Sequence, residues 1–129
     1  AGLLAEYFYL PQGMSFTAIP DLTGTPDLVQ VEDQIYHPQT AEPWPGVGVA
    51  DHFAARWTGL IFIDSPGTYA FTLNSDDGSR LYISGTMVVD NDGLHGMQAR
   101  SGSIFLFSGQ HLFQVEYFDA SLDAGIIWS

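Results

Sequence analysis

The stretch GTYAFTLNSDDGSRLYI, residues 67–83, contains an acidic pair between two segments that are typical of β-strands. In the first segment Tyr69, Phe71 and Leu73 alternate with small or polar residues, which places the large apolar side chains on one face of a strand. A second segment rich in strand-forming residues follows the pair and its glycine. The stretch therefore predicts two strands with the acidic pair at the junction.

The same kind of pattern recurs along the chain, whereas signals for helices are weak. Turn-forming dipeptides such as Ser84-Gly85 separate the apolar segments and suit tight hairpins. Eight or nine short strands at this spacing predict an all-β fold, an antiparallel β-sandwich or barrel of jelly-roll-like form, with little or no helix. The predicted strands are Leu3–Leu10, Leu28–Ile35, Phe53–Ile63, Thr68–Ser75, Arg80–Ser84, Thr86–Asp90, Ser103–Phe107, His111–Asp119 and Gly125–Trp128.

Two segments rich in glycine, proline or polar residues, Pro38–Asp51 and Asn91–Gly102, are predicted as long loops. Long loops in a small β domain are the expected carriers of binding contacts. Because the 129 residues show no internal repeat and no linker, residues 1–129 are expected to form one domain. The domain is expected to come from a larger, multidomain protein.

The charge balance limits the partners that this chain can have. It carries 15 acidic residues against three basic ones, all arginine, which gives a net charge of −12. Such a chain should repel nucleic acid and anionic membrane surfaces, and no apolar run approaches the roughly 18 residues of a membrane span. The acidity suits a medium rich in divalent cations, although it can also serve solubility alone. The absence of cysteine excludes a disulfide scaffold and a thiolate metal site.

The acidic pair Asp76-Asp77 allows two interpretations. In an ordinary strand successive side chains face opposite sides, and an acidic pair before glycine is common in solvated turns. Alternatively, an unusual backbone turns both carboxylates toward one point, where a hard cation with oxygen ligands fits best, calcium first. The residues alone leave both interpretations open.

Several blocks of sequence together resemble the protective-antigen fourteen-kilodalton (PA14) domain family. The stretch 67–83 carries the central block, and the others follow the order of the family over nearly the whole chain. They are Gly2-Leu3-Leu4-Ala5-Glu6-Tyr7-Phe8, Arg56-Trp57-Thr58-Gly59, Val88-Val89-Asp90-Asn91, Gly93-Leu94-His95 and Gly109–Phe118. The resemblance implies a β-sandwich or barrel that serves as a non-catalytic module in adhesins, glycosidases or toxins. Many members of the family bind carbohydrate.

The resemblance also implies a metal site. In the adhesin branch of the family, two adjacent aspartates are joined by a cis peptide bond and bind calcium, and Asp76 and Asp77 match that pair. The loop after the penultimate long strand completes the site, which assigns a side-chain oxygen to Asp119 and main-chain carbonyls to Ser121 and Asp123. The implied cofactor is Ca²⁺, whose remaining coordination positions would accept two sugar hydroxyls.

Aromatic side chains in or beside the predicted loops are candidates for sugar contact, because aromatic faces pack against sugar rings. We assign Trp44 and His95 to this role beside Asp76 and Asp77, with packing in the core or a loop as the alternative for each. Two further choices stay open. Arg80 pairs with a nearby acid or touches ligand, and the segment from Asp90 is more typical of a turn than of a calcium loop.

The sequence therefore predicts a calcium-dependent lectin module of a cell-surface or secreted adhesin, extracellular and directed at cell-surface glycans or oligosaccharides. Alternatives are a structural or protein-interaction module without sugar binding, and an accessory module of a glycoside hydrolase. We predict no catalysis by this chain. Hydrolysis of a glycoside needs two carboxylates on opposite sides of the bond, about 5–9.5 Å apart, and adjacent residues that converge on one point do not provide this. No nucleophile elbow or phosphate-binding loop is found in the sequence.

Overall fold

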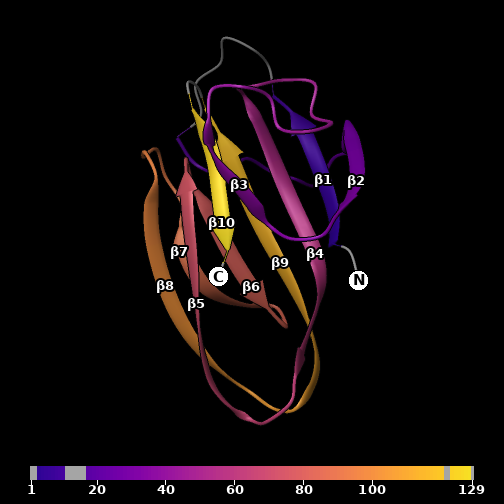
Figure 1. Cartoon of the computed structure of the whole chain (residues 1–129), viewed down its shortest axis with the longest axis vertical. Helices are drawn as coiled ribbons and strands as arrows, with labels where there is room; N and C mark the ends of the chain where they lie inside the picture. Colours follow the sequence, from indigo (N-terminus) through magenta and orange to yellow (C-terminus); the bar gives the residue numbers. More distant parts are fainter. Residues whose placement is uncertain (1–2, 11–16, 121–122, 129) are drawn as a thin grey trace.

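Two antiparallel sheets pack face to face in the computed structural model, which describes residues 3–10, 17–120 and 123–128 (Figure 1). One sheet has six strands in the order β2-β1-β4-β9-β6-β7, and the other has four in the order β3-β10-β5-β8. The strands are β1 Leu3–Tyr9, β2 Leu28–Glu32, β3 Tyr36–Thr40, β4 Phe53–Ile63, β5 Gly67–Asp76, β6 Ser79–Ile83, β7 Thr86–Asn91, β8 Gln98–Leu106, β9 Gly109–Asp119 and β10 Ala124–Trp128. These residues contain no helix, and hence none long and apolar enough to cross a membrane. The predicted β-sandwich is confirmed.

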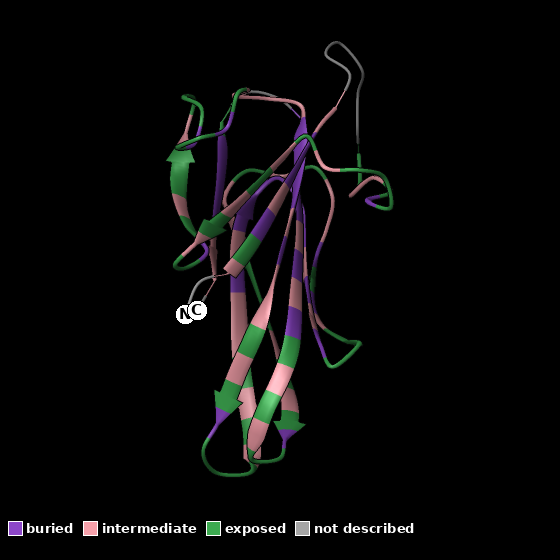
Figure 2. Cartoon of the chain, turned by 90° about the vertical axis from the view of Figure 1, so that its right-hand side faces the viewer, coloured by how far each residue is buried: buried purple, intermediate pink, exposed green. Residues whose placement is uncertain are grey.

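The core lies between the two sheets and follows the alternation of the sequence. On β9 the side chains of Phe113, Val115 and Tyr117 are buried, while Gln114 and Glu116 between them are more exposed. Trp57 of β4 is fully buried and is paired with Val115 of β9. Figure 2 shows the same alternation as bands of buried and exposed residues along the strands. The hairpin predicted at Ser84-Gly85 joins β6 to β7.

Both predicted long loops are shorter in the structure, because each contains part of a strand. β3 lies partly within Pro38–Asp51, and β8 begins within Asn91–Gly102. Pro38 argues against a strand in sequence, but β3 is an edge strand, where the missing N–H group is tolerated. Gly102 also weakens the prediction of a strand. A Cβ atom there would lie 1.9 Å from the carbonyl oxygen of Val88, so glycine lets β8 pass close to β7.

A partly buried carboxylate, that of Glu32, links the edge of the six-stranded sheet to the other sheet. β2 ends at Glu32 rather than at the predicted Ile35, and the Glu32 carboxylate accepts hydrogen bonds from the Tyr7 hydroxyl, Gln30 Nε2 (2.7 Å) and Trp57 Nε1 (3.0 Å). His37 Nε2 of β3 lies 3.0 Å from the same group. Burial opposes the ionisation of Glu32, but these hydrogen bonds outweigh it and lower the pKa of Glu32 to about 2.

We expect Glu32→Gln to lower the free energy of unfolding by about 2–4 kcal/mol near pH 7, since an amide cannot accept from all four donors. The pKa of Glu32 falls from its ordinary 4.5 to about 2 on folding. The stabilisation by the carboxylate is therefore complete above pH 4.5 and is lost as the pH falls toward 2. Urea unfolding near pH 7 and near pH 2.5 measures this effect. A difference between the variant and the wild type that is equal at both pH values would contradict the assignment.

Candidate metal-binding site

Three strands place an acidic cluster at one end of the sandwich. β5 ends at Asp76 and β9 ends at Asp119, on opposite sheets, and β10 begins near both, with Gly125 paired to Asp76. These strand ends lie at the top of the molecule in Figure 1. The site thus lies where the ends of both sheets meet, beside Ala120 and Asp123.

The acidic pair converges on Asp119. The peptide bond between Asp76 and Asp77 is cis, as the resemblance implies. The three carboxylates offer one oxygen atom each within 4.8 Å of one another. The side chains are buried, with exposed fractions of 8% for Asp76, 6% for Asp77 and 0% for Asp119. The structure therefore does not support the alternative of a solvated turn.

The glycine that follows the acidic pair is required by packing. A Cβ atom at Gly78 would lie 2.4 Å from Asp92 Oδ1, 2.6 Å from Phe118 Cε1 and 2.7 Å from the Gly93 nitrogen. Two of these atoms belong to the segment between β7 and β8. Gly78 thus lets that segment approach the acidic pair closely.

Hydrogen bonds hold the two adjacent aspartates in place. Gln39 Nε2 of β3 donates to Asp76 Oδ2 (2.6 Å). Two backbone N–H groups donate to Asp77, from His95 to Oδ1 (3.2 Å) and from Ala120 to Oδ2 (2.9 Å). The Tyr117 hydroxyl, in the core, donates to the Asp76 carbonyl oxygen. The pair is therefore fixed from both sheets and from two loops.

Asp119 differs from the other two carboxylates, because neither of its buried oxygens has a hydrogen-bond partner. Burial, followed by the negative charges of Asp77, Asp51 and Asp76, raises the pKa of Asp119 to about 9. Burial also raises the pKa of Asp76, and the nearby charges of Asp77 and Asp123 add to this effect. Three carboxylates pressed together in this way favour the uptake of a proton or of a cation.

The donor set fits a hard divalent cation. The described residues of the cluster offer carboxylate oxygens only, which are the ligands of calcium rather than of softer metals. The buried oxygens of Asp119 have no other partner to satisfy them. Calcium therefore fits these residues on chemical grounds, while its binding remains a prediction.

An open cleft of about 340 Å³ lies in front of the cluster. It is lined by Asp76, Asp77, Leu94, His95, Gly96, Ala120 and Asp123. The structure thus brings the predicted residues Asp123 and His95 to the same cleft as the acidic pair. Ser121 lies outside the described residues. Leu94, Ala120 and Gln39 are additions that the sequence did not indicate, since their roles depend on the tertiary contacts of loops and an edge strand.

Trp44 does not line this cleft, and its assignment as a sugar contact requires correction. Its side chain is 3% exposed and stacks on His37, with ring centroids 4.0 Å apart, and on Tyr117 at 5.3 Å. The apolar core covers the indole ring because the segment after β3 folds inward. Trp44 is a core residue.

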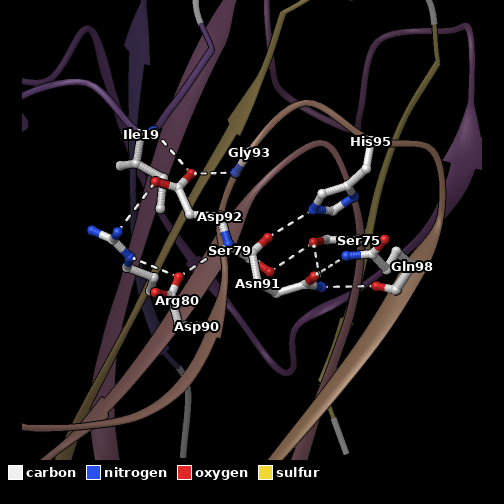
Figure 3. Close-up of polar contacts among 10 residues, drawn as sticks. All are labelled: Ile19, Ser75, Ser79, Arg80, Asp90, Asn91, Asp92, Gly93, His95 and Gln98. Carbon is white, nitrogen blue, oxygen red and sulfur yellow. Dashed lines mark hydrogen bonds and ion pairs between the residues drawn. The ribbon is translucent and has the colours of Figure 1, made fainter.

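The segment that follows β7 forms an ion-paired turn (Figure 3). Arg80 pairs with Asp90 (3.1 Å) and Asp92 (3.4 Å), so it pairs with acids rather than pointing at ligand. Asp92 Oδ1 accepts hydrogen bonds from the backbone N–H groups of Ile19 (3.0 Å) and Gly93 (2.8 Å). These contacts agree with a turn and not with a second calcium loop.

The fold and the acidic cluster define a two-sheet β domain with a candidate cation site at one end. The model of the PA14 domain family matches residues 14–126. The chain belongs to the PA14 domain family, which confirms the resemblance found in the sequence.

The known proteins with a similar sequence or fold belong to different kinds of protein. The anti-sigma-I factor RsgI3 of Acetivibrio thermocellus is 29% identical over 82 residues, which are 61% of this chain and 13% of that protein. The PA14 domain of the MpAFP antifreeze protein has a TM-score of 0.83 at 18% identity, over 99% of this chain and 81% of that one. The PA14 sugar-binding domain of an RTX adhesin has a TM-score of 0.80 at 20% identity, over 98% and 87%. The two structural matches show the fold alone, and the chain spans only a small part of the curated relative.

We expect calcium binding to release about one proton near pH 7.5, because Asp119, with a pKa of about 9, is protonated in the metal-free protein at that pH. The raised pKa also means that the metal-free fold loses stability as the pH rises from the ordinary pKa of 3.8 toward 9. Calorimetry of calcium binding in Tris and in PIPES measures the proton release, since the two buffers differ in their enthalpy of ionisation. Binding enthalpies that agree between the buffers would contradict the expectation.

Proposed function

We propose that this domain is a calcium-dependent carbohydrate-binding module that recognises hydroxyl groups of cell-surface glycans or oligosaccharides. In this role it is a binding module of a cell-surface or secreted protein and not an enzyme. Asp76, Asp77 and Asp119 hold the ion through their side chains. Asp123 and Ser121, in the segment after β9, are the proposed sources of further oxygen ligands.

The observation that carries the proposal is the environment of Asp119. Its carboxylate is completely buried, has no hydrogen-bond partner on either oxygen and faces Asp76 and Asp77. A buried group without a partner is costly, and two further carboxylates beside it increase that cost. A bound divalent cation would supply a partner for the unpaired oxygens and would reduce the repulsion between the carboxylates. The arrangement is therefore more favourable with a cation than without one.

The open cleft supports binding of an exposed ligand. Calcium, when bound, supplies coordination positions that two neighbouring sugar hydroxyls can occupy in place of water. Asp76 and Asp77 line the cleft directly, and His95 and Leu94 form part of its wall. Leu94 is 54% exposed and offers an apolar surface for the C–H face of a sugar ring. The sugar-binding PA14 domain of the RTX adhesin supports this function by analogy of fold.

A second candidate function is a structural or protein-interaction module that uses calcium without sugar, or no calcium at all. It is favoured by the similarity to part of an anti-sigma-I factor, a protein of which this domain matches only 13%. An accessory role beside a glycoside hydrolase domain is a variant of the same idea. The two candidates differ in whether the cleft binds a free glycan.

Calcium titration followed by glycan binding separates these functions. We expect saturable calcium binding by calorimetry, and then glycan-array signals that appear with calcium and disappear with EGTA. Calcium binding without any glycan signal would favour the structural module. An absence of calcium binding at millimolar concentration would overturn the proposed function.

We expect Asp119→Asn to abolish the rise in melting temperature that calcium gives the wild type. Calcium at about 100 times its dissociation constant adds about 2.7 kcal/mol to the stability of a protein that binds it only when folded. The same variant should be more stable than the wild type in EGTA near pH 7.5, because a neutral amide avoids the cost of protonating the buried carboxylate on folding. Thermal unfolding with calcium and with EGTA measures both effects.

The matched control is Asp64→Asn, which removes one carboxylate from an exposed turn between β4 and β5. This variant should respond to calcium as the wild type does. If Asp119→Asn gains as much stability from calcium as Asp64→Asn, the buried cluster is not the calcium site.

A further inference from the structure

Asn91 is a buried polar residue that contacts both sheets behind the candidate metal site. It ends β7 and is 1% exposed. Its side-chain Nδ2 donates to the carbonyl oxygens of Leu73 (3.2 Å) and Gln98 (2.8 Å) and to Ser75 Oγ (3.3 Å). Leu73 and Ser75 belong to β5, the strand that delivers the acidic pair, and Gln98 begins β8. Figure 3 shows the hydrogen bonds that join Asn91 to Ser75 and to Gln98.

Asn91 and Gln98 close the base of the segment that joins β7 to β8, residues 92–97. Gln98 Nε2 donates to Asn91 Oδ1 (3.1 Å), while Asn91 Nδ2 donates to the main-chain carbonyl oxygen of Gln98. This segment supplies the Leu94, His95 and Gly96 wall of the cleft. The amide pair therefore fixes both ends of that wall.

A first route leads from Asn91 to the main chain of Asp77. Asn91 Nδ2 donates to Ser75 Oγ, and the Ser75 hydroxyl donates to the Asp77 carbonyl oxygen (2.8 Å). The Ser79 hydroxyl lies 2.6 Å from Ser75 Oγ and completes the arrangement from the far side of the pair. All four residues are buried. The route holds the backbone of the acidic pair from behind.

A second route leads from Asn91 to the Asp77 carboxylate. His95 Nε2 lies 2.7 Å from the main-chain carbonyl oxygen of Asn91 (Figure 3). His95 Nδ1 lies 2.9 Å from the Gly96 carbonyl oxygen, so the imidazole contacts the backbone on both sides of the segment. In this position the backbone N–H of His95 donates to Asp77 Oδ1 (3.2 Å). Asn91 is thus linked to the carbonyl of Asp77 through Ser75 and to its carboxylate through His95, and it contacts neither group directly.

We propose that Asn91 is a positioning residue of the calcium and glycan site, which fixes Asp77 and the cleft wall in one geometry. The inference rests on the proposed function and adds to it a residue that lies outside the ligand set. Loss of its side chain frees the Ser75 hydroxyl from one partner and opens the base of segment 92–97. Both effects loosen the placement of Asp77, and residues behind a metal site contribute to metal affinity in this way.

The test compares Asn91→Ala with a variant that removes a buried hydrogen bond elsewhere. Tyr7→Phe is the matched control, because it deletes the buried hydroxyl that donates to Glu32 on β2 and leaves every contact of Asn91 intact. With calcium alone as the probe, we expect Asn91→Ala to raise the dissociation constant about 10- to 100-fold. Tyr7→Phe should leave it within about twofold of the wild type, although both variants lose stability.

A second readout reports on the geometry itself. Hydrogen exchange of the His95 backbone amide, measured by NMR, should be faster in Asn91→Ala than in the wild type and unchanged in Tyr7→Phe. If Asn91→Ala does not fold, Gln98→Ala serves instead, because it keeps the contacts of Asn91 with β5 and removes only the hydrogen bond from Gln98 Nε2 to Asn91 Oδ1 at the base of segment 92–97. We expect it to raise the calcium dissociation constant and to speed the same exchange.

The outcomes separate this inference from the proposed function. If the wild type binds calcium and the folded variants bind it equally well, the positioning role is wrong and the proposed function stands. If Tyr7→Phe loses as much calcium affinity as Asn91→Ala, the loss follows from lower stability of the fold, and the inference is also wrong. If the wild type binds no calcium, both the inference and the proposed function fail.

Discussion

Three carboxylates with oxygens within 4.8 Å of one another repel strongly when they are shielded from water, and Asp76, Asp77 and Asp119 are in this position. The sandwich nevertheless brings them together, from the ends of β5 and β9 on opposite sheets. Protonation relieves part of the repulsion, as the raised pKa of Asp119 shows. A divalent cation would offset two of the three negative charges, and this electrostatic constraint links the fold to the proposed function.

The rest of the molecule holds this unfavourable arrangement in place. The hydroxyl of Tyr117, buried among core aromatics, bonds to the carbonyl oxygen of Asp76. Gln39 fixes the Asp76 carboxylate from the edge strand β3, and backbone amides fix that of Asp77. Glu32 in turn connects β3 to the larger sheet through His37. The contacts thus extend from the core to the site, so its geometry depends on the packing of both sheets.

Much of the fold could be predicted from the sequence, because alternation of apolar residues and turn dipeptides report directly on half-buried strands. The failures lie at the sheet edges. Proline and glycine are uncommon in strands, so Pro38 argues against β3 and Gly102 against the start of β8. Pro38 is tolerated because β3 is an edge strand, and Gly102 allows the close approach of β8 to Val88. The acidic pair and Asp119 are predicted as a site through the family resemblance, whereas the residues alone leave both a turn and a cation site open. Trp44 was misassigned because its surroundings suggested a loop, and only the folded chain shows its ring covered by His37 and Tyr117.

The central claim is that a calcium ion joins Asp76, Asp77 and Asp119. The most direct measurement is anomalous X-ray diffraction from crystals of the domain grown with calcium. The account predicts one anomalous peak contacted by oxygens of all three side chains, at the end of the sandwich where β5 and β9 finish. A structure at the same calcium concentration with no peak there, and with Asp119 bonded as a neutral acid to a neighbouring carboxylate, would contradict it.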